Sequence, residues 1–330
     1  MPYLMSEVYP NRIGYNQAPM SRFAKFAWLV LGYHVLVILW GAFVRATGSG
    51  AGCGSHWPLC NGEVIPRSPT VETLIEFSHR LTSGLAAVWV LALVIWAFRA
   101  FPRKHIVRFG ALMSMLFMVI EALVGAGLVL FEQVADNVAL SRAVWMAAHL
   151  LNTFILLAWI TLMAWWASGG SRFALRGQGA VGWGVFGALV LMTLIGISGA
   201  VTALGDTLMH LGAIEKNPVV GETLLALRIY HPTLAILIAG YMIVVLTQVA
   251  LARLSTLALR LAIGFNALYL LQLGLGALNV WFKAPVWMQL VHLLLTDVLW
   301  ILLVVFSAGV LSVQPQLRAG VQEAHPSALP

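Results

Sequence analysis

Charged residues are scarce in this chain of 330 residues. Asp, Glu, Lys and Arg make up 9% of it, 61% is hydrophobic, and the mean hydropathy is +0.90. Soluble domains carry about 25% charged residues, so a soluble globular protein is excluded. Eight apolar runs reach the length of about 20 residues that crosses a bilayer core. The expected spans are 23–45, 73–97, 107–131, 143–167, 180–204, 227–251, 259–282 and 287–313.

The net charge of +7 does not indicate a nucleic-acid partner, because the basic residues are unevenly placed along the chain. If the N-terminus is cytoplasmic, the inner segments hold 12 of the 19 Lys and Arg residues, and the outer loops hold most of the acids. This is the positive-inside pattern, which predicts a multi-pass protein with both termini in the cytoplasm. The first apolar run is too long for the core of a signal peptide, so we expect it to be retained.

The second half of the chain repeats the first. Residues 121–131 align without gaps to 272–282, and histidines recur in the same order, His79 with His231 and His149 with His292. Each half has four spans and returns to the same side, so the halves are expected to share one orientation around an axis along the membrane normal. The fold class is therefore an all-α membrane protein with eight transmembrane helices in two pseudo-symmetric four-helix bundles. The expected divisions are an N-terminal segment 1–22, a front half 23–167, a linker 168–179, a back half 180–313 and a polar tail 314–330.

Four histidines lie near the outer ends of the spans that run inward. They are His79, His149, His231 and His292. Imidazole is costly inside hydrocarbon, so an intramembrane histidine is a candidate for function. The second and fourth helices of a bundle can face each other, and two such pairs predict two haem irons with paired axial ligands. A hydrogen-bonded packing role is the alternative for any one of them, and zinc is a weaker one because its sites recruit further ligands.

Other histidines and small residues are given ordinary roles. We expect His34 to pack within the first span, and His56, His105 and His210 to be solvated in loops. His325 lies in the polar tail and carries no expectation of function. Glycines within the spans are assigned to helix packing alone.

Cys53 and Cys60 are the only cysteines and lie in a loop that is expected outside, where thiols are oxidised. A structural disulfide and a thiol pair that passes electrons both fit this placement. Glu76 lies three residues before His79 and thus on the same helix face. It is either a helix N-terminal charge or a buried carboxylate that handles protons at a haem edge. Arg80 could pair with a haem propionate or with Glu76.

These residues resemble a known family. The segment GAFVRATGSGAGCGSHWPLCNG followed by IEFSHRLTSG is similar to the first loop and second helix of haem A synthases that carry a cysteine pair. The later elements MAAHLLNT, RIYHPT and VHLLLTD follow in the matching order. The resemblance covers all eight spans, and its most specific parts are the cysteine loop and the EFSHR segment.

The resemblance implies a membrane oxidoreductase that converts haem O to haem A, by two hydroxylations of a methyl group and loss of water, for terminal oxidase biogenesis. His79 and His149 would hold the substrate haem O, and His231 and His292 would hold a retained haem b that relays electrons. Glu76 would be the catalytic carboxylate, and Cys53 and Cys60 would form the family's disulfide. The location would be a bacterial inner membrane, and the partners a haem O synthase (a farnesyltransferase) and an electron acceptor.

One departure is that the loop of the back half, 205–226, contains no second cysteine pair, which some family members have. Two other functions share the histidines: a dihaem b-type protein that only transfers electrons, and a haem carrier. The confinement of Glu76, Arg80 and the cysteines to the front half favours the enzyme. The sequence does not determine the electron acceptor, the oxygen source, the oligomeric state, or whether both front histidines bind iron throughout turnover.

Overall fold

The computed structural model describes residues 20–312, and the expectations for residues 1–19 and 313–330, including His325, lie outside the described residues. Its helices are α1 (Arg22–Ala46), α2 (Val71–Ala100), α3 (Ile106–Leu130), α4 (Leu140–Ala167), α5 (Gly179–His210), α6 (Pro218–Leu227), α7 (Tyr230–Ala252), α8 (Thr256–Trp281) and α9 (Val286–Leu311). Eight of the helical segments are long and apolar enough to cross a membrane, with α6 and α7 forming one of them. The expected all-α fold with eight spans is confirmed, and the chain is a multi-pass membrane protein.

The helix boundaries follow from capping chemistry. Ser21, Thr70 and Ser255 each accept a hydrogen bond from a backbone N–H in the first turn of α1, α2 and α8, which satisfies a donor that the helix itself leaves unpaired. Large apolar side chains cover the outside of the bundle, with Trp183 75% and Trp281 81% exposed. Apolar area of this extent is unfavourable in water and favourable against lipid tails.

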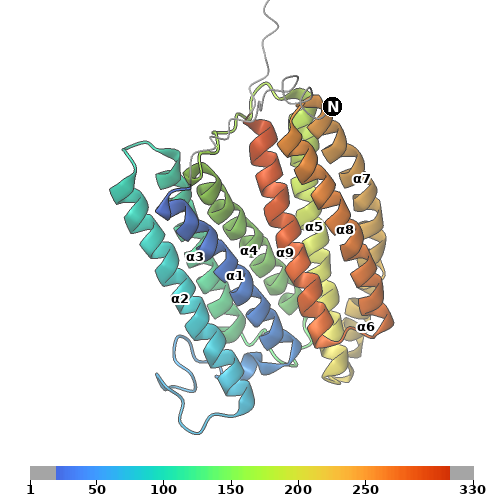
Figure 1. Cartoon of the computed structure of the whole chain (residues 1–330). Coiled ribbons are helices and arrows are strands. Elements are labelled where there is room, and N and C mark those ends of the chain that lie inside the picture. Colours follow the sequence, from blue (N-terminus) through green and yellow to red (C-terminus); the bar gives the residue numbers. More distant parts are fainter. Residues whose placement is uncertain (1–19, 313–330) are drawn as a thin grey trace, which may run out of the picture.

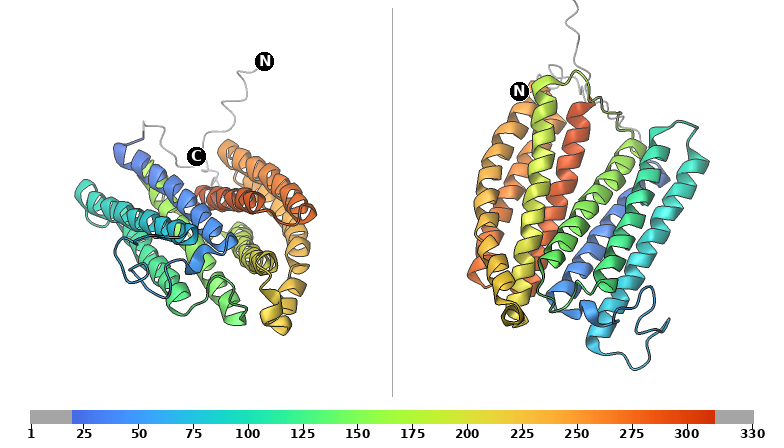
Figure 2. Two further views of the ribbon diagram at one scale, coloured as in Figure 1. Left: turned by 90° about the horizontal axis from the view of Figure 1, so that it is seen from below. Right: turned by 180° about the vertical axis from the view of Figure 1, so that it is seen from behind.

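The two halves stand side by side, with α1–α4 on one side and α5–α9 on the other (Figures 1 and 2). Helix α4 lies against both α5 and α9, and α1 lies against α9, so these four helices form the junction. At its centre the rings of Phe154 and Trp300 stack with centroids 4.7 Å apart, and the Trp300 indole donates to the Phe154 carbonyl at 2.7 Å. This contact joins α4 and α9, the helices that carry His149 and His292.

Arg45 fastens the junction near the end that carries the cysteine loop. It lies in the last turn of α1, and its guanidinium donates to the Ala203 carbonyl at 2.6 Å, to the Thr207 hydroxyl and to the Gln289 amide oxygen at 3.0 Å. One front-half side chain therefore binds α5 and α9 at once. At the opposite end the linker closes on the last helix, where the Ala174 N–H donates to the Leu311 carbonyl at 3.0 Å.

The back half differs from the expected loop at 205–226, which is mostly helical. Helix α5 continues to His210, and Asn217 caps α6, which begins with Pro218. The second span of this half is therefore interrupted between α6 and α7, around Arg228 and Ile229. Pro232 gives the reason, because a proline ring clashes with the carbonyl four residues before it, which is that of Arg228. The break leaves His231 in the first turn of α7.

Candidate functional site

The four predicted histidines each lie against a glycine of a neighbouring helix. A Cβ atom built on Gly41 would lie 2.9 Å from Cε1 of His79, and one on Gly199 would lie 3.0 Å from Cε1 of His231. The corresponding distance is 3.2 Å between Gly276 and His292, and 3.9 Å between Gly125 and His149. All four glycines precede an alanine, in Gly41–Ala42, Gly125–Ala126, Gly199–Ala200 and Gly276–Ala277. The same contact is built four times, on α1 with α2, α3 with α4, α5 with α7 and α8 with α9.

The glycines were not assigned to the site from the sequence, and Gly41 was not singled out at all. The signal that could have found them is the repeated Gly-Ala pair in the helices that precede the histidine helices. The absence of a side chain at these glycines leaves room for the imidazole ring of each histidine. A flat macrocycle that lies beside a helix needs space of the same kind. Small residues in membrane helices otherwise allow close helix approach, which is why the pattern alone was ambiguous.

The histidines meet in pairs within each half. The rings of His231 and His292 have centroids 6.4 Å apart and planes at 74°. Metal-bound imidazole nitrogens lie about 2.0 Å from the metal in zinc sites, and the ring centre lies roughly 1 Å farther out, so two opposed imidazoles on one ion have centres about 6 Å apart. In the front half, His79 and His149 are close enough to interact electrostatically. The spacing of the back pair therefore fits a metal held between its two rings.

The Nδ1 atoms of the four rings differ in their hydrogen-bond partners. The Nδ1 atoms of His79, His149 and His292 are buried without a hydrogen-bond partner, whereas Nδ1 of His231 lies 2.9 Å from the Ser198 hydroxyl. Buried polar groups without partners are uncommon in folded proteins. No group of three or more His, Cys, Asp or Glu within residues 20–312 could hold a metal ion. Two imidazoles suit a metal that brings its remaining ligands with it, as iron in a porphyrin does.

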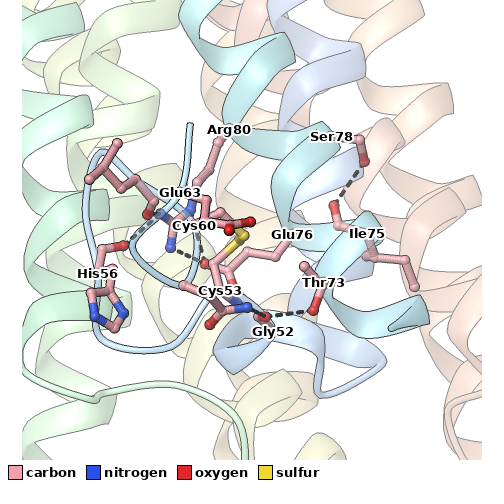
Figure 3. The surroundings of a disulfide bond; sticks show 12 residues. Gly52, Cys53, His56, Cys60, Glu63, Thr73, Ile75, Glu76, Ser78 and Arg80 are labelled. Atoms are coloured by element: carbon pink, nitrogen blue, oxygen red, sulfur yellow. Dashed lines mark hydrogen bonds and ion pairs between the residues drawn. A yellow bond between two sulfur atoms is a disulfide. The ribbon is translucent and has the colours of Figure 1, made fainter. Parts of the chain in front are cut away.

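A disulfide joins Cys53 to Cys60 in the loop between α1 and α2, as expected (Figure 3). Both cysteines are buried. The loop lies directly on the start of α2, where a Cβ on Gly52 would come within 2.4 Å of the Glu72 carbonyl carbon, so only glycine fits there. The Thr73 hydroxyl donates to the Gly52 carbonyl at 2.7 Å and holds the same contact.

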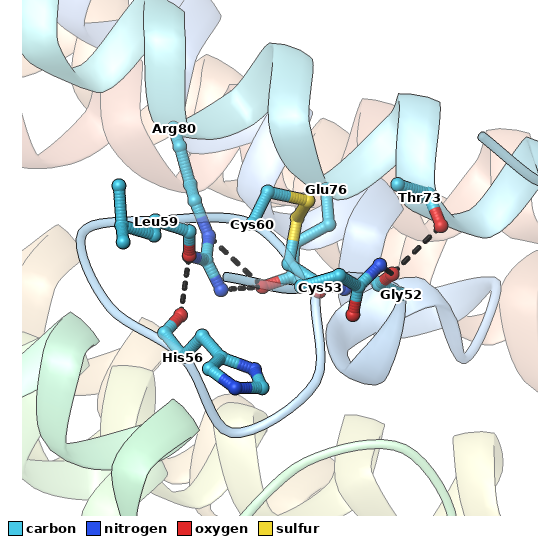
Figure 4. A network of polar contacts seen from close by, with 9 residues as sticks. Gly52, Cys53, His56, Leu59, Cys60, Thr73, Glu76 and Arg80 are labelled. Atoms are coloured by element: carbon cyan, nitrogen blue, oxygen red, sulfur yellow. Dashed lines mark hydrogen bonds and ion pairs between the residues drawn. A yellow bond between two sulfur atoms is a disulfide. The ribbon is translucent and has the colours of Figure 1, made fainter. Parts of the chain in front are cut away.

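Glu76 is buried under this loop, and its carboxylate is held by hydrogen bonds and an ion pair. Its carboxylate accepts from the Cys53 backbone N–H at 2.9 Å and forms an ion pair with Arg80 one turn along α2. The guanidinium of Arg80 also donates to the carbonyls of His56 and Leu59, both at 2.7 Å (Figure 4). Of the two partners expected for Arg80, the structure contains the pairing with Glu76. These two side chains couple the disulfide loop to the helix that carries His79.

His34 and His56 are placed as expected, whereas His210 ends α5 instead of lying in a loop and His105 is half-buried. His34 is buried in α1, where its Nδ1 lies 2.7 Å from the Val30 carbonyl. His56 and His210 are exposed. His105 caps α3 by accepting from the Val107 N–H, and burial together with the Arg172 guanidinium lowers its pKa.

A cavity of about 700 Å³ opens beside the disulfide loop, lined by Ala51, Gly54, Glu132 and the α3–α4 connection. Asp136 and Lys216 form an ion pair at this cavity and so link the two halves. The hydrogen bond from Lys216 lowers the pKa of the Asp136 carboxyl below its ordinary value of 3.8.

Comparison with known proteins identifies a family and several similar proteins. The family model named COX15-CtaA, described as a cytochrome oxidase assembly protein, matches residues 24–304. A protein of Thermus thermophilus named protoheme IX farnesyltransferase is 55% identical over 296 residues, which are 88% of this chain and 49% of that protein. The chain thus spans about half the length of this relative. Proteins named heme A synthase are 44% identical over 123 residues in Halalkalibacterium halodurans (37% of this chain, 41% of that protein) and 48% identical over 99 residues in Geobacillus kaustophilus (30% and 31%).

Proposed function

Because the chain belongs to the COX15-CtaA family of cytochrome oxidase assembly proteins, we propose that it is a haem A synthase, which oxidises the methyl group of haem O to the formyl group of haem A. The observation that carries the proposal is the set of four intramembrane histidines, each backed by a glycine and paired within its own half. Pure electron transfer would need the same pairs. The disulfide loop, Glu76 and Arg80 are attached to the front pair alone, which supports different tasks for the two halves.

In this proposal His79 and His149 hold the substrate haem O, and His231 and His292 hold a retained haem b. Bound haem iron supplies the one-electron and oxygen chemistry. The protein's own contribution is to bind and orient the rings: Gly41 and Gly199 leave the space that His79 and His231 occupy. An apolar bundle open to lipid also suits a porphyrin that carries a farnesyl chain.

Glu76 is the proposed catalytic carboxylate, since it lies one turn before His79 on α2. Its position depends on the Cys53 N–H and on Arg80, so the loop sets where the carboxylate stands. The disulfide keeps that loop closed over the carboxylate, a structural task that does not require the cysteines to change oxidation state.

We propose a haem farnesyltransferase as the partner that supplies the substrate. In the Thermus relative, a segment similar to this chain makes up 49% of a protein named protoheme IX farnesyltransferase, which supports such a partner. The acceptor of the electrons would be a further membrane partner, and the location a bacterial inner membrane with both chain termini in the cytoplasm.

Expression of the chain in cells that make haem O, followed by mass analysis of the extracted haems, tests the function. The formyl product is expected, and it should disappear in His79→Ala. Unaltered haem O together with a bound b-type spectrum would instead favour electron transfer or haem carriage. If cells that lack a farnesyltransferase make haem O when they express this chain, the chain itself would have the farnesyltransferase activity for which the Thermus relative is named.

Glu76→Gln separates catalysis from anchoring. The amide can still accept from the Cys53 N–H, so we expect the loop to keep its resistance to proteolysis and haem to stay bound, while the formyl product is lost. Glu63→Gln is the matched control, because Glu63 lies in the same loop and pairs with Arg67 at the surface. Normal product formation by Glu76→Gln would remove Glu76 from the mechanism.

A further inference from the structure

The two halves differ at the residue that faces the fourth-span histidine. In the gapless alignment of 121–131 with 272–282, Glu121 of α3 occupies the position of Gln272 of α8. Both side chains lie next to the histidine helix of their own half, α4 and α9 respectively. A carboxylate in a membrane span is costly and usually marks a function. A glutamine at the same place carries no charge and so does not have this cost.

In the front half, the carboxylate of Glu121 faces the ring of His149. Its Oε1 lies 3.6 Å from Nδ1 of His149. The carboxylate also accepts from the Asn152 amide and the Thr153 hydroxyl, both on α4 at 2.5 Å. Two donors of α4 thus fix the carboxylate beside the ring, and the Nδ1 atom otherwise has no hydrogen-bond partner.

In the back half, the equivalent groups are arranged differently. The Gln272 amide donates to the Thr296 hydroxyl at 2.8 Å and to the His292 carbonyl at 2.9 Å. Thr296 corresponds to Thr153, but Leu295 stands where the front half has Asn152. The amide-nitrogen side of Gln272 is therefore turned toward α9, and the donor that would hold a carboxylate is missing.

We propose that Glu121 is a positioning residue for His149, accepting a hydrogen bond from its Nδ1 and so strengthening Nε2 as an iron ligand in the front half only. Metal-binding histidines commonly donate their second ring nitrogen to a carboxylate or carbonyl, which fixes the ring and raises its basicity as a ligand. A more basic ligand stabilises ferric over ferrous iron. The front iron would thereby differ from the back iron, because His292 has Gln272 in place of the carboxylate. The inference rests on the proposed haem ligation.

The test is the reduction potential of each haem in the purified, haem-loaded full chain, measured by spectroelectrochemical titration. Glu121→Gln is expected to raise the potential of the front haem and leave the back one unchanged. A tenfold change in the ratio of ferric to ferrous iron corresponds to about 59 mV for this one-electron couple. The matched control is Glu132→Gln, which removes the same charge from an exposed position just after α3 and should shift neither haem by that amount.

The reverse exchange tests the same idea in the other half. Gln272→Glu with Leu295→Asn rebuilds the front arrangement around His292, and it should lower the potential of the back haem by a comparable amount. This variant decides the matter even if Glu121→Gln fails to retain its haem. Rescue is expected from Glu121→Asp to a greater extent than from Glu121→Gln, with the low-spin ferric EPR signal following the same order.

Unmoved potentials in both exchanges, or equal shifts in Glu121→Gln and Glu132→Gln, would overturn the inference. Formation of the formyl haem is scored separately. If that product forms while the potentials stay unmoved, the positioning role fails and the proposed enzyme stands. If the potentials shift without any formyl product, the ligand interaction stands and the enzymatic function fails.

Discussion

Replacement of Gly41 by alanine probes the space behind the front histidine. The new Cβ would lie 2.9 Å from Cε1 and 3.1 Å from Nε2 of His79, whereas carbon atoms in contact are about 3.5 Å apart or more. The backbone of α1 is fixed by its helix, so the imidazole must retreat by about 0.6 Å. A displacement of 1 Å can cost about 100-fold in rate, and we expect roughly a tenfold loss of formyl haem here.

The matched control for this variant is Gly125→Ala, where the Cβ would lie at the ordinary contact distance of 3.9 Å from His149. Alanine favours a helix by up to about 1 kcal/mol relative to glycine, so neither variant should unfold more readily. The assay compares formyl haem per bound haem, and the low-spin spectrum of the front haem reports the ring directly. Equal activity of Gly41→Ala and the unaltered protein, or an equal loss in Gly125→Ala, would refute the reasoning about space.

Three further predictions concern the parts around the histidines. Cys53→Ser opens a loop of about eight residues, which should cost ~2.5 kcal/mol of local stability; faster proteolysis within the loop checks this, and unchanged proteolysis would contradict it. Arg45→Ala leaves three acceptors of the back half without their donor and should lower the stability by about 2–4 kcal/mol, measured as a fall in Tm in detergent, while Arg67→Ala at the surface should leave Tm unchanged. The lowered pKa of Asp136 means that its pairing with Lys216 stabilises the fold above pH about 4, and this stabilisation is lost as the pH falls through the lowered pKa. Because the pair is exposed, Lys216→Met should lower the free energy of unfolding by less than about 1 kcal/mol at pH 7 and leave it unchanged at a pH where Asp136 is protonated. A larger effect at either pH would be evidence against this account.

The spans and the histidines could be predicted because each depends on local composition. A bilayer core requires about 20 apolar residues whatever surrounds them, so all eight spans were found, with ends within a few residues of the helices in most cases. The predicted loop at 205–226 was wrong for a related reason: Glu222 and the polar residues before it resemble a loop in hydropathy, but Asn217 and Pro218 form a helix start. Capping chemistry, rather than hydropathy, determined the structure there.

The sequence by itself determined the all-α membrane fold, the cysteine pair, and the four imidazoles with their order along the chain. Only the tertiary structure decided which face of each helix meets which neighbour, because spans that are apolar all round carry little information about facing. Gly41 behind His79, the burial of Glu76 beneath the disulfide loop, and the contact between Glu121 and His149 all join separate segments. Each of these depends on helix packing, so none can be deduced from the residues of one span.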